Sequence, residues 1–244
     1  MRCSDEYYYV VKFQGNPQHP RTLVNELLGT RLAQRIGIPV PETAIVEVSA
    51  SLVRGTPELS MQLAGQTVPC RPGLHFGSRY AADPSQSHIL DYLPRKMLTK
   101  VRNLETFAGV LALDKWACNA DSRQAVFWKS RDEREYRTVF IDQGSFFNGP
   151  EWSFPDSARR GIYPDREVYK HVQSWERFEP WLSRIETLDE AGVWGCAKEI
   201  PPEWYCGDLE AVEKLIARLL KRRTRVREMI AATRKSSVNP FTNW

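Results

Sequence analysis

Val139-Phe140-Ile141-Asp142-Gln143-Gly144 and the upstream stretch Cys118-Asn119-Ala120-Asp121-Ser122-Arg123-Gln124 decide the fold of this chain. The residues between them are typical of a β-hairpin, with strands at 125–129 and 136–141 and a charged turn at 130–135. Asp121 then precedes the first strand, and Asp142 follows the second. Because the open ends of an antiparallel hairpin lie side by side, we expect the two carboxylates to meet.

Two carboxylates so placed indicate phosphoryl transfer. One orients or deprotonates an attacking hydroxyl, and the other holds the magnesium ion that neutralises charge on the phosphates. Asp142 alone would also fit an ordinary turn, because Asp-x-Gly is common where a strand ends. The apolar run before it, however, would fix its carboxylate on a rigid strand end, as a metal ligand requires.

A lysine on a strand completes this set of residues. Lys12 lies in Tyr7-Tyr8-Tyr9-Val10-Val11-Lys12-Phe13, an aromatic and β-branched run that predicts a strand. From there its ammonium could reach the α and β phosphates, with Glu26 on the following helix holding it in place. Two alternatives stay open at this point: Lys12 as a solubilising lysine of an edge strand, and Glu26 as an ordinary helix-surface residue.

Asp114 competes with Asp121 for the role of catalytic base. Its spacing to Asn119 matches the Asp-x-x-x-x-Asn of a kinase catalytic loop. The apolar run 104–118, however, predicts a helix with Asp114 in its last turn and Asp121 in the loop beyond. A base in that loop can approach a substrate hydroxyl. We therefore expect Asp121 to be the base.

The remaining pattern predicts an α+β chain of two lobes. In the small lobe, about residues 1–80, we expect a helix from Leu23 to Gly37 and strands at 44–48, 58–63 and 74–77. In the larger and mainly helical lobe, about residues 81–244, the hairpin accompanies helices at 104–118, 166–174, 179–188 and 208 to about 233.

Composition narrows the class of protein. The balance of 34 basic and 30 acidic residues demands no acidic polymer as partner. The basic run 221–227 would suit nucleic acid, but an apolar helical face continues through it and arginines stabilise a helix carboxyl end, so we expect no direct nucleic-acid binding. Five cysteines without metal or disulfide spacing favour reduced thiols. With no stretch near the roughly 18 apolar residues of a membrane span, we expect a cytoplasmic protein that binds no membrane.

The chain resembles the HipA-like kinase family, bacterial proteins related to the HipA serine/threonine kinases of toxin–antitoxin systems. The resemblance covers almost the whole chain and is carried by six stretches in the right order. These are Tyr9-Val10-Val11-Lys12-Phe13-Gln14-Gly15-Asn16-Pro17, Leu23-Val24-Asn25-Glu26, Gly37-Ile38-Pro39-Val40-Pro41, His75-Phe76-Gly77-Ser78-Arg79-Tyr80, Asp114-Lys115-Trp116-Ala117-Cys118-Asn119-Ala120-Asp121 and Ile141-Asp142-Gln143-Gly144.

The resemblance implies a two-lobed protein-kinase-like fold with ATP and Mg²⁺ bound between the lobes. By that likeness Lys12 contacts phosphates, Glu26 positions Lys12, Asp121 acts on the substrate hydroxyl and Asp142 binds magnesium. The implied partners are ATP, a phosphoacceptor that is most simply a serine or threonine of a protein, and an antitoxin-like protein.

The likeness also suggests where the adenine ring binds. The segment 74–79 is similar to the strand that leads to the adenine-binding hinge, which makes Phe76, Gly77 and Ser78 candidate nucleotide contacts.

Two departures from the family pattern favour alternatives. Only eleven residues precede Lys12, where the family has a Gly/Ser-rich phosphate loop. The metal-binding Asn expected five residues after the catalytic Asp falls on Val126, so Gln124 or Asn119 would have to supply the amide oxygen. A pseudokinase that binds a partner, and a kinase of small molecules or lipid headgroups, are therefore the competing hypotheses.

Overall fold

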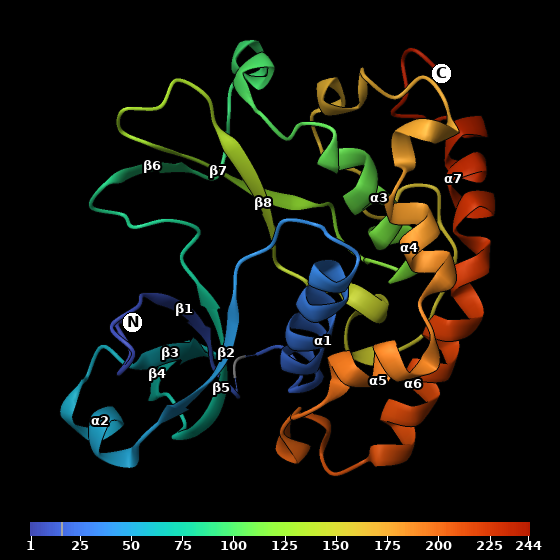
Figure 1. Cartoon of the computed structure of the whole chain (residues 1–244). Coiled ribbons are helices and arrows are strands. Elements are labelled where there is room, and N and C mark those ends of the chain that lie inside the picture. Colours follow the sequence, from blue (N-terminus) through green and yellow to red (C-terminus); the bar gives the residue numbers. More distant parts are fainter. Residues whose placement is uncertain (16) are drawn as a thin grey trace.

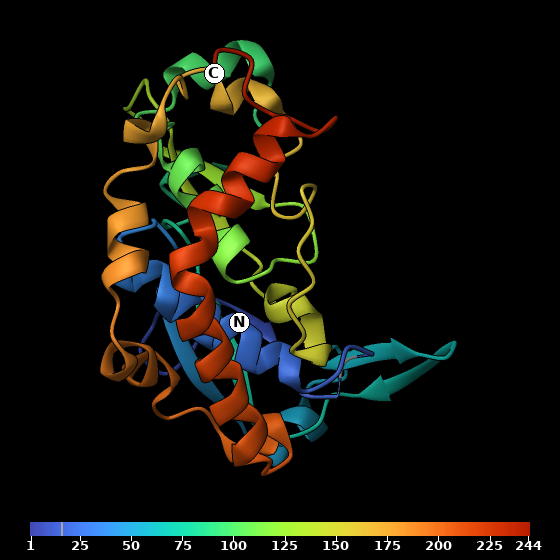
Figure 2. The same ribbon diagram turned by 90° about the vertical axis from the view of Figure 1, so that its right-hand side faces the viewer.

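The small lobe is built on a three-stranded antiparallel sheet in the order β1-β5-β2, formed by β1 (Tyr9–Lys12), β5 (Gly73–Arg79) and β2 (Thr43–Val48). The computed structural model describes residues 1–15 and 17–244, so Asn16 of the first family-like stretch lies outside the described residues. A short helix α2 (Ala50–Gly55) follows β2, and the hairpin of β3 (Ser60–Leu63) and β4 (Gln66–Pro69) projects from the body (Figure 2). The structure confirms, within a few residues, the predicted strand that contains Lys12 and those at 44–48, 58–63 and 74–77. Helix α2 and strand β4 were not expected.

Helix α1 (Arg21–Arg35) lies between the small sheet and the helices of the large lobe (Figure 1). Its leucines at 23, 27, 28 and 32 are buried, as the helical spacing predicts. The helix ends where Gly37 adopts a φ of +81°, a left-handed conformation that glycine allows without strain. Because packing encloses nearly the whole helix, its polar residues Asn25 and Glu26 are buried as well.

A second antiparallel sheet, in the order β6-β7-β8, opens the large lobe. The predicted hairpin is confirmed as β7 (Gln124–Ser130) and β8 (Arg137–Ile141), and the unexpected β6 (Ser87–Leu90) pairs with β7. Ala125 and Phe127 on β7 are buried on the helix-facing side, while Val126, paired with Val139, lies half-buried on the side that faces the small lobe. This alternation gives the sheet one face toward the core and one toward the cleft.

Helices make up most of the rest of the large lobe. They are α3 (Thr106–Trp116), α4 (Trp181–Thr187), α5 (Glu190–Ala197), α6 (Leu209–Arg222) and α7 (Val226–Lys235), with 3₁₀ turns at Arg95–Lys100, Phe146–Glu151, Arg166–Tyr169, Trp175–Phe178, Pro202–Tyr205 and Arg223–Arg225. Helix α3 is buried along its entire length. Among the described residues, none of the helices combines the length and the apolar character needed to cross a membrane.

Two predicted helices of this lobe were wrong in extent. The segment 166–174 forms only a 3₁₀ turn at Arg166–Tyr169, followed by a tight bond from the Val172 N–H to the Tyr169 carbonyl, and Val168, Tyr169 and Val172 are buried without a longer helix. The single element expected from 208 to 233 is divided into α6 and α7.

The arginines of the basic run meet partners within the protein. Arg222 is buried and donates to the main-chain oxygens of Lys115 and Trp116 and to Asp156. Arg223 donates to the Leu188 carbonyl, and Arg227 pairs with two glutamates, Glu179 and Glu186. Arg222 thereby joins α6 to the end of α3, whereas Arg223 and Arg227 contact α4 and the residues that flank it.

Candidate active site

Three charged side chains from distant parts of the sequence meet between the lobes. Lys12 on β1 donates to the Glu26 carboxylate on α1 and, over 2.7 Å, to Oδ1 of Asp142, which directly follows β8. The Glu26 side chain is almost fully buried, whereas those of Lys12 and Asp142 are 28% and 34% exposed. The cluster therefore has a closed end at Glu26 and an end open to solvent at Lys12 and Asp142.

Glu26 also holds the backbone beside Asp142. Its carboxylate accepts the N–H of Gln143 over 3.1 Å and the N–H of Gly144 over 2.9 Å. A Cβ on Gly144 would lie 2.9 Å from Glu26 Oε1 and 2.8 Å from a Thr22 methyl, so the Asp-x-Gly glycine is required by this close approach. One buried carboxylate thus fixes both the lysine and the turn that carries Asp142.

Asp142 itself has a left-handed backbone, with a φ of +62°. This conformation costs a non-glycine residue of order 1 kcal/mol and persists only where its surroundings enforce it. Here the two N–H bonds to Glu26 follow the residue, and the Ile141 carbonyl before it accepts from Arg123 over 2.7 Å. In this turn the Asp142 carboxylate accepts from Lys12 through Oδ1 and from Gln124 through Oδ2.

The charges in the cluster shift each other's ionisation. Burial lowers the pKa of Lys12, but the Glu26 and Asp142 carboxylates outweigh it and the lysine pKa is raised overall. For Asp142 burial raises the pKa, and the Lys12 ammonium reverses that effect, so the pKa is lowered. Burial raises the pKa of Glu26 against the opposing effect of Lys12. Lys12 and Asp142 therefore remain oppositely charged at neutral pH.

The segment 119–124 is joined to the end of β8 by one hydrogen bond to Asp142 and one to Ile141. Gln124 donates its amide N–H to Asp142 Oδ2 over 2.7 Å, and Arg123 donates to the adjacent Ile141 carbonyl. The segment and the end of β8 thus lie together, as the hairpin geometry predicts. Asp121, three residues before Gln124, is exposed, and its carboxylate accepts the N–H of Ser122 over 2.7 Å.

Asp114 is placed very differently from Asp121. It is fully buried and receives two bonds from the Arg123 guanidinium, of 2.7 and 3.1 Å, and one from the Asn119 amide. The Asn119 oxygen in turn accepts the N–H of Asp121 over 3.1 Å, so both ends of that amide are engaged. Asp114, Asn119 and Arg123 therefore brace the loop from inside, whereas the Asp121 carboxylate is exposed to solvent.

Arg123 is the site residue that sequence reasoning missed. An aspartate in a fully apolar helix needs a cation nearby, since an unpaired buried charge is costly. Asp114 lies in such a helix, and Arg123 lies in the loop directly beyond it. These two features of the sequence would have predicted the Asp114–Arg123 ion pair.

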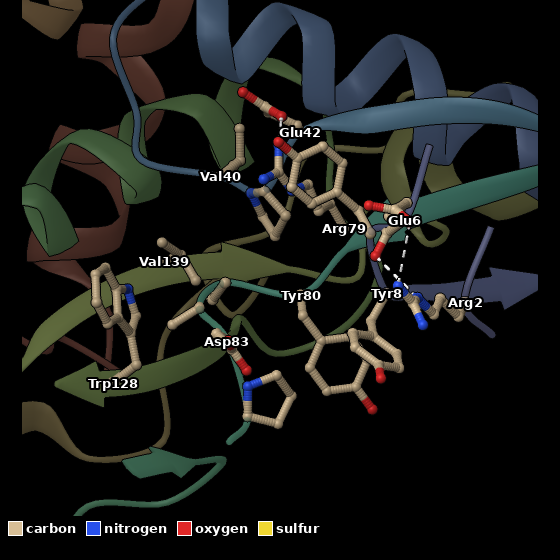
Figure 3. A pocket seen from close by; sticks show the side chains of 15 residues that line it. Arg2, Glu6, Tyr8, Val40, Glu42, Arg79, Tyr80, Asp83, Trp128 and Val139 are labelled. Carbon is tan, nitrogen blue, oxygen red and sulfur yellow. Dashed lines mark hydrogen bonds and ion pairs between the residues drawn. The ribbon is translucent and has the colours of Figure 1, made fainter. Parts of the chain in front are cut away.

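A cavity of about 620 Å³ lies between the segment that follows β5 and the cleft face of β7 and β8 (Figure 3). Its walls include Tyr8 and Tyr80 on one side and Trp128 and Val139 on the other. The main-chain N–H and C=O groups of Ala81 and Ala82, which also line it, make no hydrogen bond to other described residues. Aromatic walls with free backbone polar groups suit a flat heteroaromatic ring.

The residues suggested by the family likeness for adenine contact lie just before this cavity. The Phe76 side chain is packed in the hydrophobic core, and a Cβ on Gly77 would lie 2.6 Å from a Val46 methyl. Phe76, Gly77 and Ser78 also pair with both β1 and β2, because β5 is the central strand. The cavity instead begins at Arg79, which is paired with Glu42 (Figure 3).

A family model described as HipA-like kinase matches residues 1–231 of the chain. The chain belongs to the HipA-like kinase family. Among solved structures it is similar to the proinflammatory kinase CtkA of Helicobacter pylori, with a TM-score of 0.54, 12% identity and 92% of each chain covered. It is also similar to the Golgi casein kinase, with a TM-score of 0.52, 12% identity, and 97% of this chain and 70% of that chain covered.

These likenesses establish the protein-kinase-like fold predicted from the sequence. A further structure of the Golgi casein kinase, with Mn/ADP bound, has a TM-score of 0.50, 12% identity and the same coverage. A comparison with curated proteins found no significant match. Membership of the HipA-like kinase family makes phosphotransfer the class of activity that the site has to explain.

The residues around Asp142 fit a magnesium ion in a nucleotide complex. Asp142 offers a carboxylate at the open end of the cluster, and Gln124 brings an amide against it. Within residues 1–15 and 17–244 no group of three or more His, Cys, Asp or Glu side chains could hold a metal alone. That suits Mg²⁺, which commonly takes one or two protein ligands and completes its shell with phosphate oxygens and water. Val126 lies on the same strand face two residues beyond Gln124 and offers no ligand.

Proposed function

We propose that this HipA-like kinase transfers the γ-phosphate of ATP, with Mg²⁺, to a serine or threonine hydroxyl of a protein. The observation that carries the proposal is the cluster of Lys12, Glu26 and Asp142, which joins the two lobes at the open end of the hairpin. A cation for phosphates and a carboxylate for a metal stand there beside an exposed aspartate in the adjoining loop.

In this proposal each residue of the chain has one task. Lys12 binds phosphate oxygens, and Glu26 keeps its ammonium and the Asp142 turn in place. Asp142, with Gln124, holds Mg²⁺, which neutralises the charge on the phosphates. Asp121 orients the acceptor hydroxyl and takes its proton. The hydroxyl oxygen bonds to the γ-phosphorus while the bond from that phosphorus to the β–γ bridging oxygen breaks, and ADP leaves.

The adenine ring would lie in the cavity beside Tyr80 and Trp128. Ala81 and Ala82 would supply backbone hydrogen bonds to its edge, since these groups have no other partner among the described residues. We therefore move the proposed adenine contacts a few residues beyond Phe76, Gly77 and Ser78.

Transfer of labelled γ-phosphate, together with ADP release, tests the assignment of the base. Asp121→Asn should lower turnover about a hundredfold or more, the usual loss when general-base catalysis is removed. Nucleotide binding should survive, because Asp121 has no contact with Lys12, Glu26 or Asp142. Full turnover in this variant would contradict the assignment.

Val126 favours a second candidate, a nucleotide-binding pseudokinase that holds a partner such as an antitoxin-like protein. The residue places an apolar side chain on the cleft face where a second metal ligand is expected. This candidate predicts ATP binding without ADP release in the wild-type chain, so the assay above separates the two functions.

A further inference from the structure

A second cavity, of about 540 Å³, lies at the start of β7, beside the loop that contains Asp121. It is lined at one end by Ser122, which donates to the Asp121 carboxylate, and by Gln124, which donates to Asp142. At the other end it is lined by Asp91, Tyr92 and Arg95. A molecule lying in this groove would contact Ser122, whose N–H and hydroxyl are bonded to the Asp121 carboxylate.

The pairing of β6 with β7 explains why these ends are close. The strands are antiparallel, and Leu90, the last residue of β6, pairs with Phe127. The chain beyond Leu90 therefore runs back along β7 toward its first residue, Gln124. Asp91 and Tyr92 are carried by this register to the loop that contains Asp121.

The charges of the groove are unequal. Arg95 is shared between Asp165, at 3.2 Å, and Glu167, at 4.0 Å. Asp91 is exposed and has no cationic partner among the described residues. The other arginine of the lining, Arg123, is neutralised by buried Asp114. The lining thus holds two aspartates and two arginines, and Asp91 is its acid without an ion-pair partner among the described residues.

Exposed apolar side chains extend the surface beyond the groove. Tyr92 is 63% exposed, and Leu90 on the same segment is 37% exposed. Exposed tyrosine beside arginine is typical of surfaces that bind polypeptides. A tyrosine face next to a free carboxylate favours a lysine or arginine side chain, which can pair with the acid and lie over the ring.

From these contacts we propose that the groove binds the phosphoacceptor as an extended polypeptide segment with a basic side chain close to the acceptor serine or threonine. Asp91 pairs with that side chain, and Tyr92 packs against its aliphatic part. The inference rests on the proposed function only in calling the bound polypeptide the phosphoacceptor. The preference for a basic side chain requires neither bound nucleotide nor phosphate transfer.

Fluorescence anisotropy with labelled peptides tests the preference. Three peptides share a central serine and differ only in their flanking residues, which are arginine, glutamine or glutamate. The full chain should bind the arginine peptide about fivefold more tightly than the glutamine peptide, as expected for one partly exposed ion pair. The glutamate peptide should bind most weakly.

Matched variants locate the effect. Asp91→Lys should reverse the order of the arginine and glutamate peptides, and Asp91→Glu should keep it. Asp132→Lys makes the same charge change at an exposed residue in the β7–β8 turn, outside the groove, and should leave the order unchanged. Tyr92→Ala should weaken the binding of the arginine peptide more than the binding of the other two peptides.

Several outcomes would overturn the inference. These are equal binding of the three peptides, preference for glutamate, or the same reversal with Asp132→Lys as with Asp91→Lys. A parallel thermal-shift assay with ATP and Mg²⁺ tests the proposed function separately. If the chain prefers the arginine peptide but ATP and Mg²⁺ do not raise its unfolding midpoint, the peptide-binding groove is supported and phosphotransfer is refuted. If the midpoint rises but the three peptides bind equally, phosphotransfer is retained and the peptide-binding groove is refuted.

Discussion

Replacing Glu26 by glutamine removes one oxygen and one negative charge from the centre of the site. The carboxylate accepts from Lys12, from the Gln143 N–H and from the Gly144 N–H. An amide has one oxygen, and its NH₂ group must face donors on the other side. At least one buried donor then has no acceptor.

The expected loss of stability follows from these contacts. A buried donor without a partner costs about 1–3 kcal/mol. Loss of the charge opposite Lys12 adds less than the roughly 3–5 kcal/mol of a fully buried broken pair, because Lys12 is 28% exposed and retains Asp142 as a partner. We expect a total of about 3 kcal/mol. For a chain of this size that lowers the unfolding midpoint by about 6 to 12 °C.

Thermal unfolding of Glu26→Gln beside Glu47→Gln measures the effect. Glu47 is exposed on β2, so the same chemical change there should leave the midpoint within about 1 °C of the wild type. If the Glu26→Gln midpoint falls by less than about 2 °C, the carboxylate does not hold Lys12 and the Asp142 turn as argued.

Two further predictions concern the loop and the small sheet. Asp114→Asn leaves the Arg123 guanidinium buried without its charge partner, so it should lower the free energy of unfolding by about 3–5 kcal/mol in urea titration. Asp121→Asn changes an exposed residue and should leave the free energy of unfolding nearly unchanged. Equal stability of both variants would contradict the division between a bracing and a catalytic aspartate. His75 is buried, its Nδ1 accepts the Gln14 N–H over 3.0 Å, and burial lowers its pKa below the usual 6.5. The unfolded chain therefore binds a proton on His75 at a higher pH than the folded chain does, and stability should fall as the pH is lowered below about 6.5, by up to about 1.4 kcal/mol per pH unit. His75→Gln should flatten that part of the stability profile, and an unchanged slope would show that His75 titrates alike in both states.

The hairpin and the central helix could be predicted because their signals are local. Short apolar runs on either side of a charged turn specify β7 and β8, and leucines at helical spacing specify α1. The strand ends then fix where Asp142 and the loop lie. Lys12 and Asp142 are 130 positions apart, and no local pattern predicts their contact. It was expected only because phosphoryl transfer needs a lysine and a metal-binding carboxylate in one site.

The missed parts depend on partners distant in sequence. Strand β6 is only four residues long and follows a Pro/Ser-rich stretch. It is a strand because it pairs with β7, and its own residue pattern does not predict one. Phe76, Gly77 and Ser78 lie outside the lining of the cavity, because β5 is the central strand and its backbone is hydrogen-bonded on both sides, which its sequence alone does not reveal.

Thermal unfolding of the chain with and without ATP and Mg²⁺ tests the central claim most directly, because a ligand that binds only the folded state raises the midpoint. A nucleotide site at this cluster should give a rise that requires Mg²⁺ and corresponds to about 2.7 kcal/mol at a nucleotide concentration of about 100 times Kd. The rise should be lost in Asp142→Asn. No rise in the wild type, or an equal rise in Asp142→Asn, would contradict a nucleotide site built on Lys12, Glu26 and Asp142.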